Sequence, residues 1–212
     1  MDGAIAKFQK AQEWNPELEL EPEAKAKAIA LVAKGEELGA QGDVDGAIAK
    51  FQEAKEWNRE LELQPEIKAR QLAVPAKVKQ GEQLAKEGKL TKALSLYKQA
   101  QQLDPNLDID ADSWNNLCWF GSLHGYAADV MDACEKAVAK EPENGGIKDS
   151  RGLARALTGD TPGAISDFQA FVDWTWDDNE LKAERQQWID ELRAGKNPFT
   201  EEVLEGLLEE SW

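Results

Sequence analysis

Apolar and small residues recur along this chain at helical spacings of three and four positions. In four places a small residue is followed four positions later by an aromatic residue and, three positions further on, by another small or apolar residue. These triplets are Ala4-Phe8-Ala11, Ala47-Phe51-Ala54, Ala93-Tyr97-Ala100 and Ala164-Phe168-Phe171. The triplet Val130-Cys134-Ala137 keeps this spacing with Cys in the aromatic position. Because residues three and four apart share one face of a helix, each triplet predicts an amphipathic helix.

A second regularity lies upstream of the last four triplets and places two residues seven positions apart. The pairs are Gly35 with Gly42, Gly81 with Gly88, Cys118 with Gly125, and Gly152 with Gly159. The first member is small enough to let two helices approach closely, and the second ends a helix in the left-handed conformation that Gly adopts most easily. No convincing stretch alternates apolar and polar residues over strand length. The pattern therefore predicts an all-α protein built from antiparallel helix pairs.

The chain also contains a near-copy of one of its own segments. Residues 2–23 and 45–66 are identical at 18 of 22 positions, at a period of 43 residues. A period of this size predicts stacked supersecondary units rather than a single globular core. Stacked units usually form an extended binding surface rather than a catalytic pocket.

The helical triplets and the residue pairs seven positions apart together resemble the tetratricopeptide repeat, whose pattern is W-x2-L-G-x2-Y, then A-x3-F, then P. Trp114-x2-Leu117-Cys118 matches the opening with Cys in place of Gly, and the closing Pro is found as Pro16, Pro105 and Pro142. The resemblance covers about residues 1–178. It implies an α-solenoid of helix pairs in a right-handed superhelix, with an inner groove lined mainly by the first helix of each pair. The segment that follows Ser113 also resembles repeats of large cyanobacterial multidomain proteins, which implies a module of a longer regulatory chain.

The repeat spacing sets the expected domain organisation. We expect a half repeat over 1–21, repeats over about 22–64, 65–107, 110–144 and 145–178, and C-terminal capping helices over 179–212. The N-terminal half repeat has no helix before it to cover the apolar face of Ile5, Phe8 and Trp14. We therefore expect self-association through this end.

The linkers between the first units are longer than the family's usual ones and carry leucines. We expect Leu18, Leu20, Leu61 and Leu63 to be buried against the following unit. Pro22 and Pro65 fit the first turn of the next helix, and Pro75 predicts a kink. Near the C-terminus, Thr200 is the expected N-cap of the last helix, with Phe199 packing on Leu204.

Composition narrows the kinds of partner. The chain has 25 Lys and Arg against 41 Asp and Glu, a formal charge of −16. This excess of negative charge argues against a nucleic-acid partner, because binding to phosphates needs clustered cations on the protein. It also argues against binding to an anionic membrane surface. No apolar run approaches the ~20 residues that a membrane-spanning helix needs. The first residues lack the basic region and the following apolar region of a signal peptide. We expect a cytoplasmic protein.

Cys118 and Cys134 occupy small contact positions on the two helices of one predicted pair. They are too few for a disulfide scaffold. The favoured interpretation is a pair of buried, reduced thiols that act as small apolar residues and lie near each other. The alternative is a redox switch, although nothing nearby clearly lowers their pKa.

Signatures of catalysis are lacking in the sequence. The single histidine, His124, excludes His-containing triads and multi-His metal sites, and is interpreted as a polar residue near a helix C-terminus. There is no phosphate-binding loop, nucleophile elbow or zinc-protease motif. We therefore expect no enzymatic activity and no cofactor.

One acidic segment, residues 104–115, partly resembles a calcium loop. Ile109 stands at the position that needs Gly, and Asn115 stands at that of the bidentate Glu. The favoured interpretation is a turn between repeats, with Asp110 or Asp112 as N-cap.

The family register predicts which side chains line the groove. They are Lys79, Glu82 and Lys86 of one unit, Asn115, Trp119 and Ser122 of the next, and Asp149 and Leu153 of the one after. A Trp among amides and charges suits peptide binding. The alternative, that Trp119 fills the core between units, stays open.

Arg151 and Arg155 stand at positions that are usually apolar in these repeats. We favour a structural ion pair or a stack on Trp114 or Trp119 over ligand binding.

The function expected from these observations is a protein-interaction scaffold that holds a peptide or helix of a partner protein in its concave groove. The alternative is a structural spacer or self-assembling array without a specific ligand.

Overall fold

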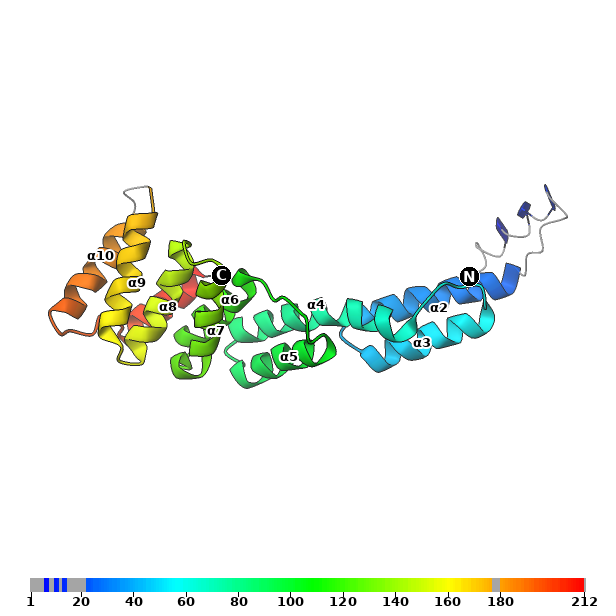
Figure 1. Ribbon diagram of the computed structural model, residues 1–212, viewed down its shortest axis with the longest axis horizontal. Helices are drawn as coiled ribbons and strands as arrows, with labels where there is room; N and C mark the ends of the chain where they lie inside the picture. Colours follow the sequence, from blue (N-terminus) through cyan, green and yellow to red (C-terminus); the bar gives the residue numbers. More distant parts are fainter. Residues whose placement is uncertain (1–5, 8–9, 12, 15–21, 177–179, 212) are drawn as a thin grey trace. The chain divides into compact units, whose positions relative to one another are not determined.

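The computed structural model describes residues 6–7, 10–11, 13–14, 22–176 and 180–211. From residue 22 onward the described residues form ten helices and no strand (Figure 1), so the all-α prediction is confirmed. The helices are α2 (Pro22–Ala40), α3 (Val44–Trp57), α4 (Pro65–Lys86), α5 (Leu90–Leu103), α6 (Ala111–Leu123), α7 (Ala127–Lys140), α8 (Gly145–Leu157), α9 (Thr161–Trp174), α10 (Glu180–Arg193) and α11 (Glu201–Glu210).

The chain divides into two compact units. The first comprises Met1–Val78 and Lys98–Leu107, and the second comprises Lys79–Tyr97 and Asp108–Trp212. Helices α4 and α5 therefore contribute residues to both units.

In the first unit, α2 and α3 lie side by side as an antiparallel pair (Figure 1). Their contact is close because Gly35 faces Phe51: a Cβ atom at Gly35 would lie 2.5 Å from Cε1 of the Phe51 ring. Phe51 is fully buried and packs with Ala47 of α3 and Ala69 of α4. The predicted role of the first glycine of each pair is confirmed here.

The same contact recurs in the second unit. A Cβ at Gly81 would lie 2.7 Å from the Tyr97 ring, and one at Gly152 would lie 2.9 Å from the Phe168 ring. Helix α8 packs on α6, α7 and α9, while α10 packs on α9. Helices α6, α8, α9, α10 and α11 share one apolar core. Its buried members are Leu123, Leu153, Ala164, Phe168, Val172, Trp188, Ile189, Leu192, Phe199 and Leu207.

The second glycine of each pair ends a helix with a positive φ, as predicted. The φ values are 82° at Gly42, 71° at Gly88, 83° at Gly125 and 89° at Gly159. A side chain at these positions would be strained in the left-handed region. The turns that join the two helices of each pair are thus set by local sequence.

The prediction of reduced cysteines is wrong. Cys118 of α6 and Cys134 of α7 form a disulfide, with their Cα atoms 4.9 Å apart. The expected positions on paired helices are correct, and both residues are buried. The separation is 16 residues, as between Gly35 and Phe51, so a covalent bond replaces the glycine–aromatic contact of the other pairs. A cytoplasmic location therefore gains no support from free thiols and stays a prediction.

Helix ends confirm most of the local predictions. Thr200 is the N-cap of α11 and accepts a hydrogen bond from the backbone N–H of Val203. Helix α4 begins at Pro65 and continues through Pro75. Leu61 and Leu63 are half-buried, less than predicted, although Leu63 does pack on the Phe51 cluster. Leu18 and Leu20 lie outside the described residues, as do Ile5 and Phe8.

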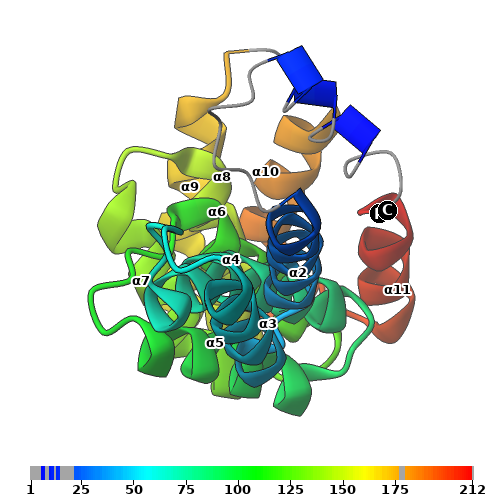
Figure 2. The same ribbon diagram turned by 90° about the vertical axis from the view of Figure 1, so that its right-hand side faces the viewer.

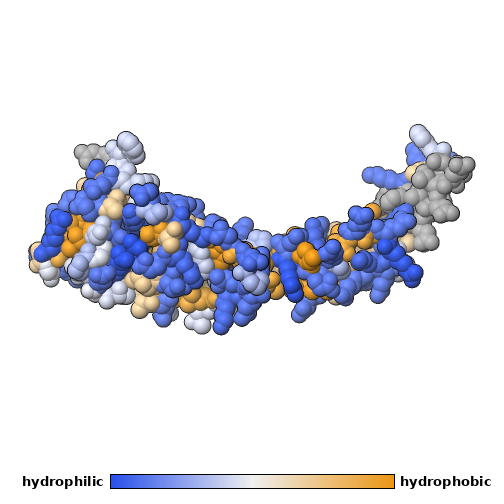
Figure 3. Space-filling view, in the orientation of Figure 1, coloured by the Kyte–Doolittle hydropathy of each residue, from blue (hydrophilic) through white to orange (hydrophobic). Residues whose placement is uncertain are grey.

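Polar residues cover most of the face shown in Figure 3, with apolar residues visible between them. No helix among the described residues is both long enough and apolar enough to span a membrane.

The glycine–aromatic contact predicts the result of a small substitution. Gly35→Ala places a methyl group against the buried Phe51 ring, and we expect the free energy of unfolding to fall by about 1–3 kcal/mol. Urea denaturation followed by circular dichroism would measure this. The double variant Gly35→Ala/Phe51→Leu, which shortens the opposing side chain, should show non-additive recovery in a double-mutant cycle. Additive losses would mean that the two residues do not contact each other.

Candidate partner-binding surface

The three candidate residues of α4 lie near the C-terminal end of that helix. Lys79 is exposed, whereas Glu82 and Lys86 are half-buried. The Lys86 ammonium lies 5.3 Å from the centroid of the Phe120 ring of α6, and the Lys86 carbonyl oxygen lies 2.8 Å from Nε2 of His124. His124 is the C-cap of α6, which confirms its predicted place at a helix end. Lys79 is thus offered to solvent, while Lys86 is held against α6.

The three candidates on α6 differ in exposure. Ser122 is fully buried, and neither its Oγ nor the Oδ1 of half-buried Asn115 has a hydrogen-bond partner among the described residues. Trp119 is half-buried and packs against the core of the second unit. Its indole Nε1 donates a hydrogen bond of 2.9 Å to Oγ of Ser211, at the C-terminal end of α11. The face of α6 that carries Trp119 is therefore in contact with α11.

The two candidates on α8 are covered by the chain itself. Leu153 has no exposed surface and belongs to the core that includes α9, α10 and α11. Asp149 is buried and accepts hydrogen bonds from Arg185 of α10, from Nε at 3.1 and 3.2 Å and from Nη2 at 2.9 Å. Burial raises the pKa of the Asp149 carboxyl, and the Arg185 guanidinium opposes that rise. The guanidinium also stacks 4.2 Å over the Trp188 ring.

These positions place six of the eight candidates in two groups, while Asn115 and Trp119 are half-buried on α6. Lys79, Glu82 and Lys86 keep accessible surface at the end of α4, and partner binding by them stays a prediction. Ser122, Asp149 and Leu153 have little or no accessible surface, so a partner could reach them only after the covering helices moved. The sequence predicts capping helices after residue 178, but no feature of it places them over the candidate groove.

Helix α11, drawn in red in Figure 2, carries five glutamates and a narrow apolar stripe. Within α11, Leu207 is the residue that is buried, and Val203, Leu204 and Leu208 pack partly against the same core. The preceding Phe199 is buried more firmly, 5.0 Å from Trp188 and 5.9 Å from Phe168 between ring centroids. Phe199 belongs to this core and Leu204 packs against it, while direct packing of Phe199 on Leu204 stays a prediction.

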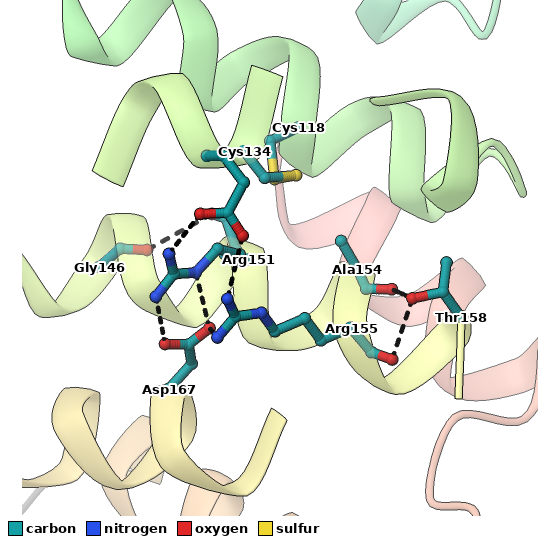
Figure 4. Close-up of a disulfide and its surroundings, with 10 residues drawn as sticks. Cys118, Cys134, Gly146, Arg151, Ala154, Arg155, Thr158 and Asp167 are labelled. Carbon is teal, nitrogen blue, oxygen red and sulfur yellow. Dashed lines mark hydrogen bonds and ion pairs between the residues drawn. A yellow bond between two sulfur atoms is a disulfide. The ribbon is translucent and has the colours of Figure 1, made fainter. Parts of the chain in front are cut away.

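Arg151 and Arg155 form the predicted structural ion pairs (Figure 4). Asp167 of α9 accepts hydrogen bonds from Nε and Nη2 of Arg151 at 2.9 and 2.8 Å, and from Nη1 of Arg155 at 2.9 Å. Glu135 of α7 also accepts from Arg151 and Arg155, at 2.8 and 2.9 Å. The four side chains join α7, α8 and α9, so the two arginines serve the fold.

The acidic segment before α6 is a turn, as favoured. Asp104 accepts a hydrogen bond from the backbone N–H of Asn106, Asp108 pairs with Lys140, and Asp110 is the N-cap of α6. Among the described residues, no group of three or more His, Cys, Asp and Glu is placed to hold a metal ion. These aspartates are engaged in ordinary contacts of a loop and a helix end.

No protein-family model matches the sequence, and no curated protein matches it significantly. Among solved structures, the chain is similar to the P58(IPK) TPR domain at 15% identity and a TM-score of 0.50, over 90% of this chain and 51% of that one. It is also similar to a thermophilic TPR protein of Thermus thermophilus, at 15% identity and a TM-score of 0.36, over 76% and 97% of the two chains.

The first similarity shows that this chain has the fold of a tetratricopeptide-repeat (TPR) domain, an α-solenoid, as its sequence pattern predicted. The chain spans about half the length of the P58(IPK) structure. The resemblance to cyanobacterial proteins stays a prediction.

Proposed function

We propose that this chain, which has the fold of a tetratricopeptide-repeat domain, is a protein-interaction scaffold that holds a segment of a partner protein on the first helices of its repeats. One observation carries the proposal. The chain's own helix α11 is seated on α6 through Trp119 and the adjoining core. A first-helix surface that binds one amphipathic helix has the shape and the apolar character to bind another.

The accessible part of this surface is at the end of α4. Lys79 and Lys86 are seven positions apart, so they lie on one side of the helix with Glu82 between them. In a chain with a formal charge of −16, two cations on one helix face form a local attraction for an acidic segment of a partner. Charged residues of this kind mainly set specificity and association rate, while apolar contacts on α6 supply affinity.

The proposal predicts the effect of reversing the two charges. With the tagged 212-residue chain as bait, the Lys79→Glu/Lys86→Glu variant should capture its specific partner at least tenfold less, a loss of about 1.4 kcal/mol. The matched control is Lys92→Glu/Lys98→Glu, which changes the charge equally on α5, a second helix. Quantitative mass spectrometry of the captured proteins would measure both. Equal losses from the two variants would mean that net charge, not this surface, governs capture.

A structural role is the second candidate function, and the near-identity of residues 2–23 and 45–66 favours it. Two almost equal units suit a longer array that acts as a spacer or self-assembles. A mass that increases with concentration in analytical ultracentrifugation, without any captured partner, would support this role. A monomer at high concentration would count against it.

A further inference from the structure

Helix α11 is attached to the rest of the second unit at two places of unequal strength. Phe199, just before the helix, is buried among aromatic rings and holds the entry to α11 in place. The helix itself contributes one buried side chain, Leu207, and the hydrogen bond between Trp119 and Ser211. A helix of ten residues is too short to be stable in water without tertiary contacts. Helix α11 could therefore leave α6 while Phe199 stays anchored.

The last turn of α11 has the wrong charge for its position. It contains Glu209 and Glu210 and no basic residue, although the C-terminal end of a helix favours cations. The charge of Glu210 also acts unfavourably on one carboxylate of its own chain, that of Glu184. The pKa of Glu184 in α10 is raised by burial, with the charges of Glu210 and Asp149 adding to this and Arg185 opposing it. A lysine in place of Glu210 would relieve both unfavourable interactions.

The apolar side of α11 shows what the surface accepts. Val203, Leu204, Leu207 and Leu208 repeat at helical spacing and face the core of α6, α8 and α10. A helix with this stripe and with basic residues in its last turn would keep every apolar contact of α11 and replace two repulsive interactions by attractive ones.

We infer that α11 is an exchangeable occupant of the α6 surface, and that the partner which displaces it is an amphipathic helix with Lys or Arg in its last turn. This inference rests on the proposed function and names the chemistry of the partner helix that covers α6, which is a different part of the partner from the acidic segment proposed to face Lys79 and Lys86. In the absence of that partner, α11 covers Trp119 and keeps the apolar surface out of water. The partner's affinity is reduced by the competition with α11, because a tethered helix has a high effective concentration.

The test uses the 212-residue chain and two labelled peptides, with binding followed by fluorescence anisotropy. One peptide has the sequence of residues 200–211, and the other is the same peptide with Glu209→Lys and Glu210→Lys. We expect the lysine peptide to bind at least tenfold more tightly than the native one. In the 212-residue chain, Leu207→Glu weakens the binding of α11, the internal competitor, and should tighten binding of both peptides at least tenfold. Trp119→Phe removes the indole donor to Ser211 and should weaken peptide binding to the Leu207→Glu chain about fivefold.

A second pair of variants strengthens the binding of α11 to the α6 surface. These variants test the inference if Leu207→Glu does not fold. Gly206→Ala adds a helix-favouring residue where a Cβ meets nothing within 4 Å, and Glu209→Lys/Glu210→Lys improves the last turn. Each should weaken binding of the lysine peptide severalfold. Equal binding of both peptides, or binding that none of these variants alters, would overturn the inference.

These results are separable from those of the capture experiment. Loss of capture in Lys79→Glu/Lys86→Glu together with no peptide binding would leave the scaffold function standing and remove the exchange of α11. Peptide binding without any captured partner would support the exchange of α11 and count against the scaffold function.

Discussion

Replacing Asp167 with Ala is expected to lower the free energy of unfolding by about 3 kcal/mol, in the range for breaking a buried ion pair. The Asp167 side chain is 4% exposed, and those of Arg151 and Arg155 are 13% and 21% exposed. Without Asp167, the Arg151 guanidinium loses its ion-pair partner on α9, and Arg155 keeps there only Asp160, 3.7 Å away at the N-cap of α9. Glu135 remains as a partner for both, which keeps the loss below the sum of two broken pairs.

Urea denaturation would measure this loss, and Glu135→Ala is the matched control. The Glu135 side chain is 48% exposed, so its removal should cost about 1 kcal/mol or less. The triple variant Arg151→Leu/Arg155→Tyr/Asp167→Ala restores the residues that the repeat pattern favours at the two arginine positions. It should recover most of the stability, because well-packed apolar residues often replace a buried ion network at little cost. If Asp167→Ala cost no more than Glu135→Ala, the network would not hold α8 to α9.

The parts of this fold that sequence could predict are those set by local spacing. The pairing of Gly35 with Phe51 follows from a small and a large residue 16 positions apart on two helices joined by a short turn, and Gly42 specifies that turn through its positive φ. One departure from the repeat pattern, at Gly121, is not predicted by the sequence analysis above. Gly121 stands where other repeats carry a large residue, because the bulkier Val130 replaces Ala opposite it, and a Cβ at Gly121 would lie 2.4 Å from Val130.

The disulfide was predictable in position but not in chemistry. The separation of 16 between Cys118 and Cys134 equals that of the glycine–aromatic pairs, and this signal placed the two residues at one contact. Whether two such thiols are oxidised depends on redox conditions as well as on geometry, and an even count of two cysteines does not decide it.

The candidate surface was the least predictable part because its coverage is non-local. Trp119 and Ser211 are 92 positions apart, and Asp149 and Arg185 are 36 apart. The helical register correctly assigned Trp119 and Asp149 to first helices. Nothing in the spacing of the repeats specifies that α10 and α11 return over those helices, so buried residues were interpreted as open groove residues.

Reduction of the Cys118–Cys134 disulfide is expected to lower the free energy of unfolding by about 3 kcal/mol, the value for closing a loop of this length in the unfolded chain. The residues of α6 and α7 make the stability of this helix pair more dependent on the disulfide. Cys134 stands where the other pairs bury Phe51, Tyr97 or Phe168, so the reduced pair has less apolar surface to bury. Urea denaturation with and without a phosphine reductant would measure the difference.

The array itself supplies the sharpest control for this prediction. Cys118→Gly/Cys134→Phe restores the glycine–aromatic pair of the neighbouring repeats, and we expect a protein insensitive to reductant that is more stable than the reduced wild type. The stability of Cys118→Ala/Cys134→Ala should also be independent of reductant. Its free energy of unfolding should stay as low as that of the reduced wild type, because two small side chains leave the aromatic position empty. A glycine–phenylalanine variant no more stable than the alanine variant would contradict the equivalence of the two contacts. It would mean that α6 and α7 have adapted their packing to the covalent bond, to the point where the aromatic ring of the other repeats no longer fits between them.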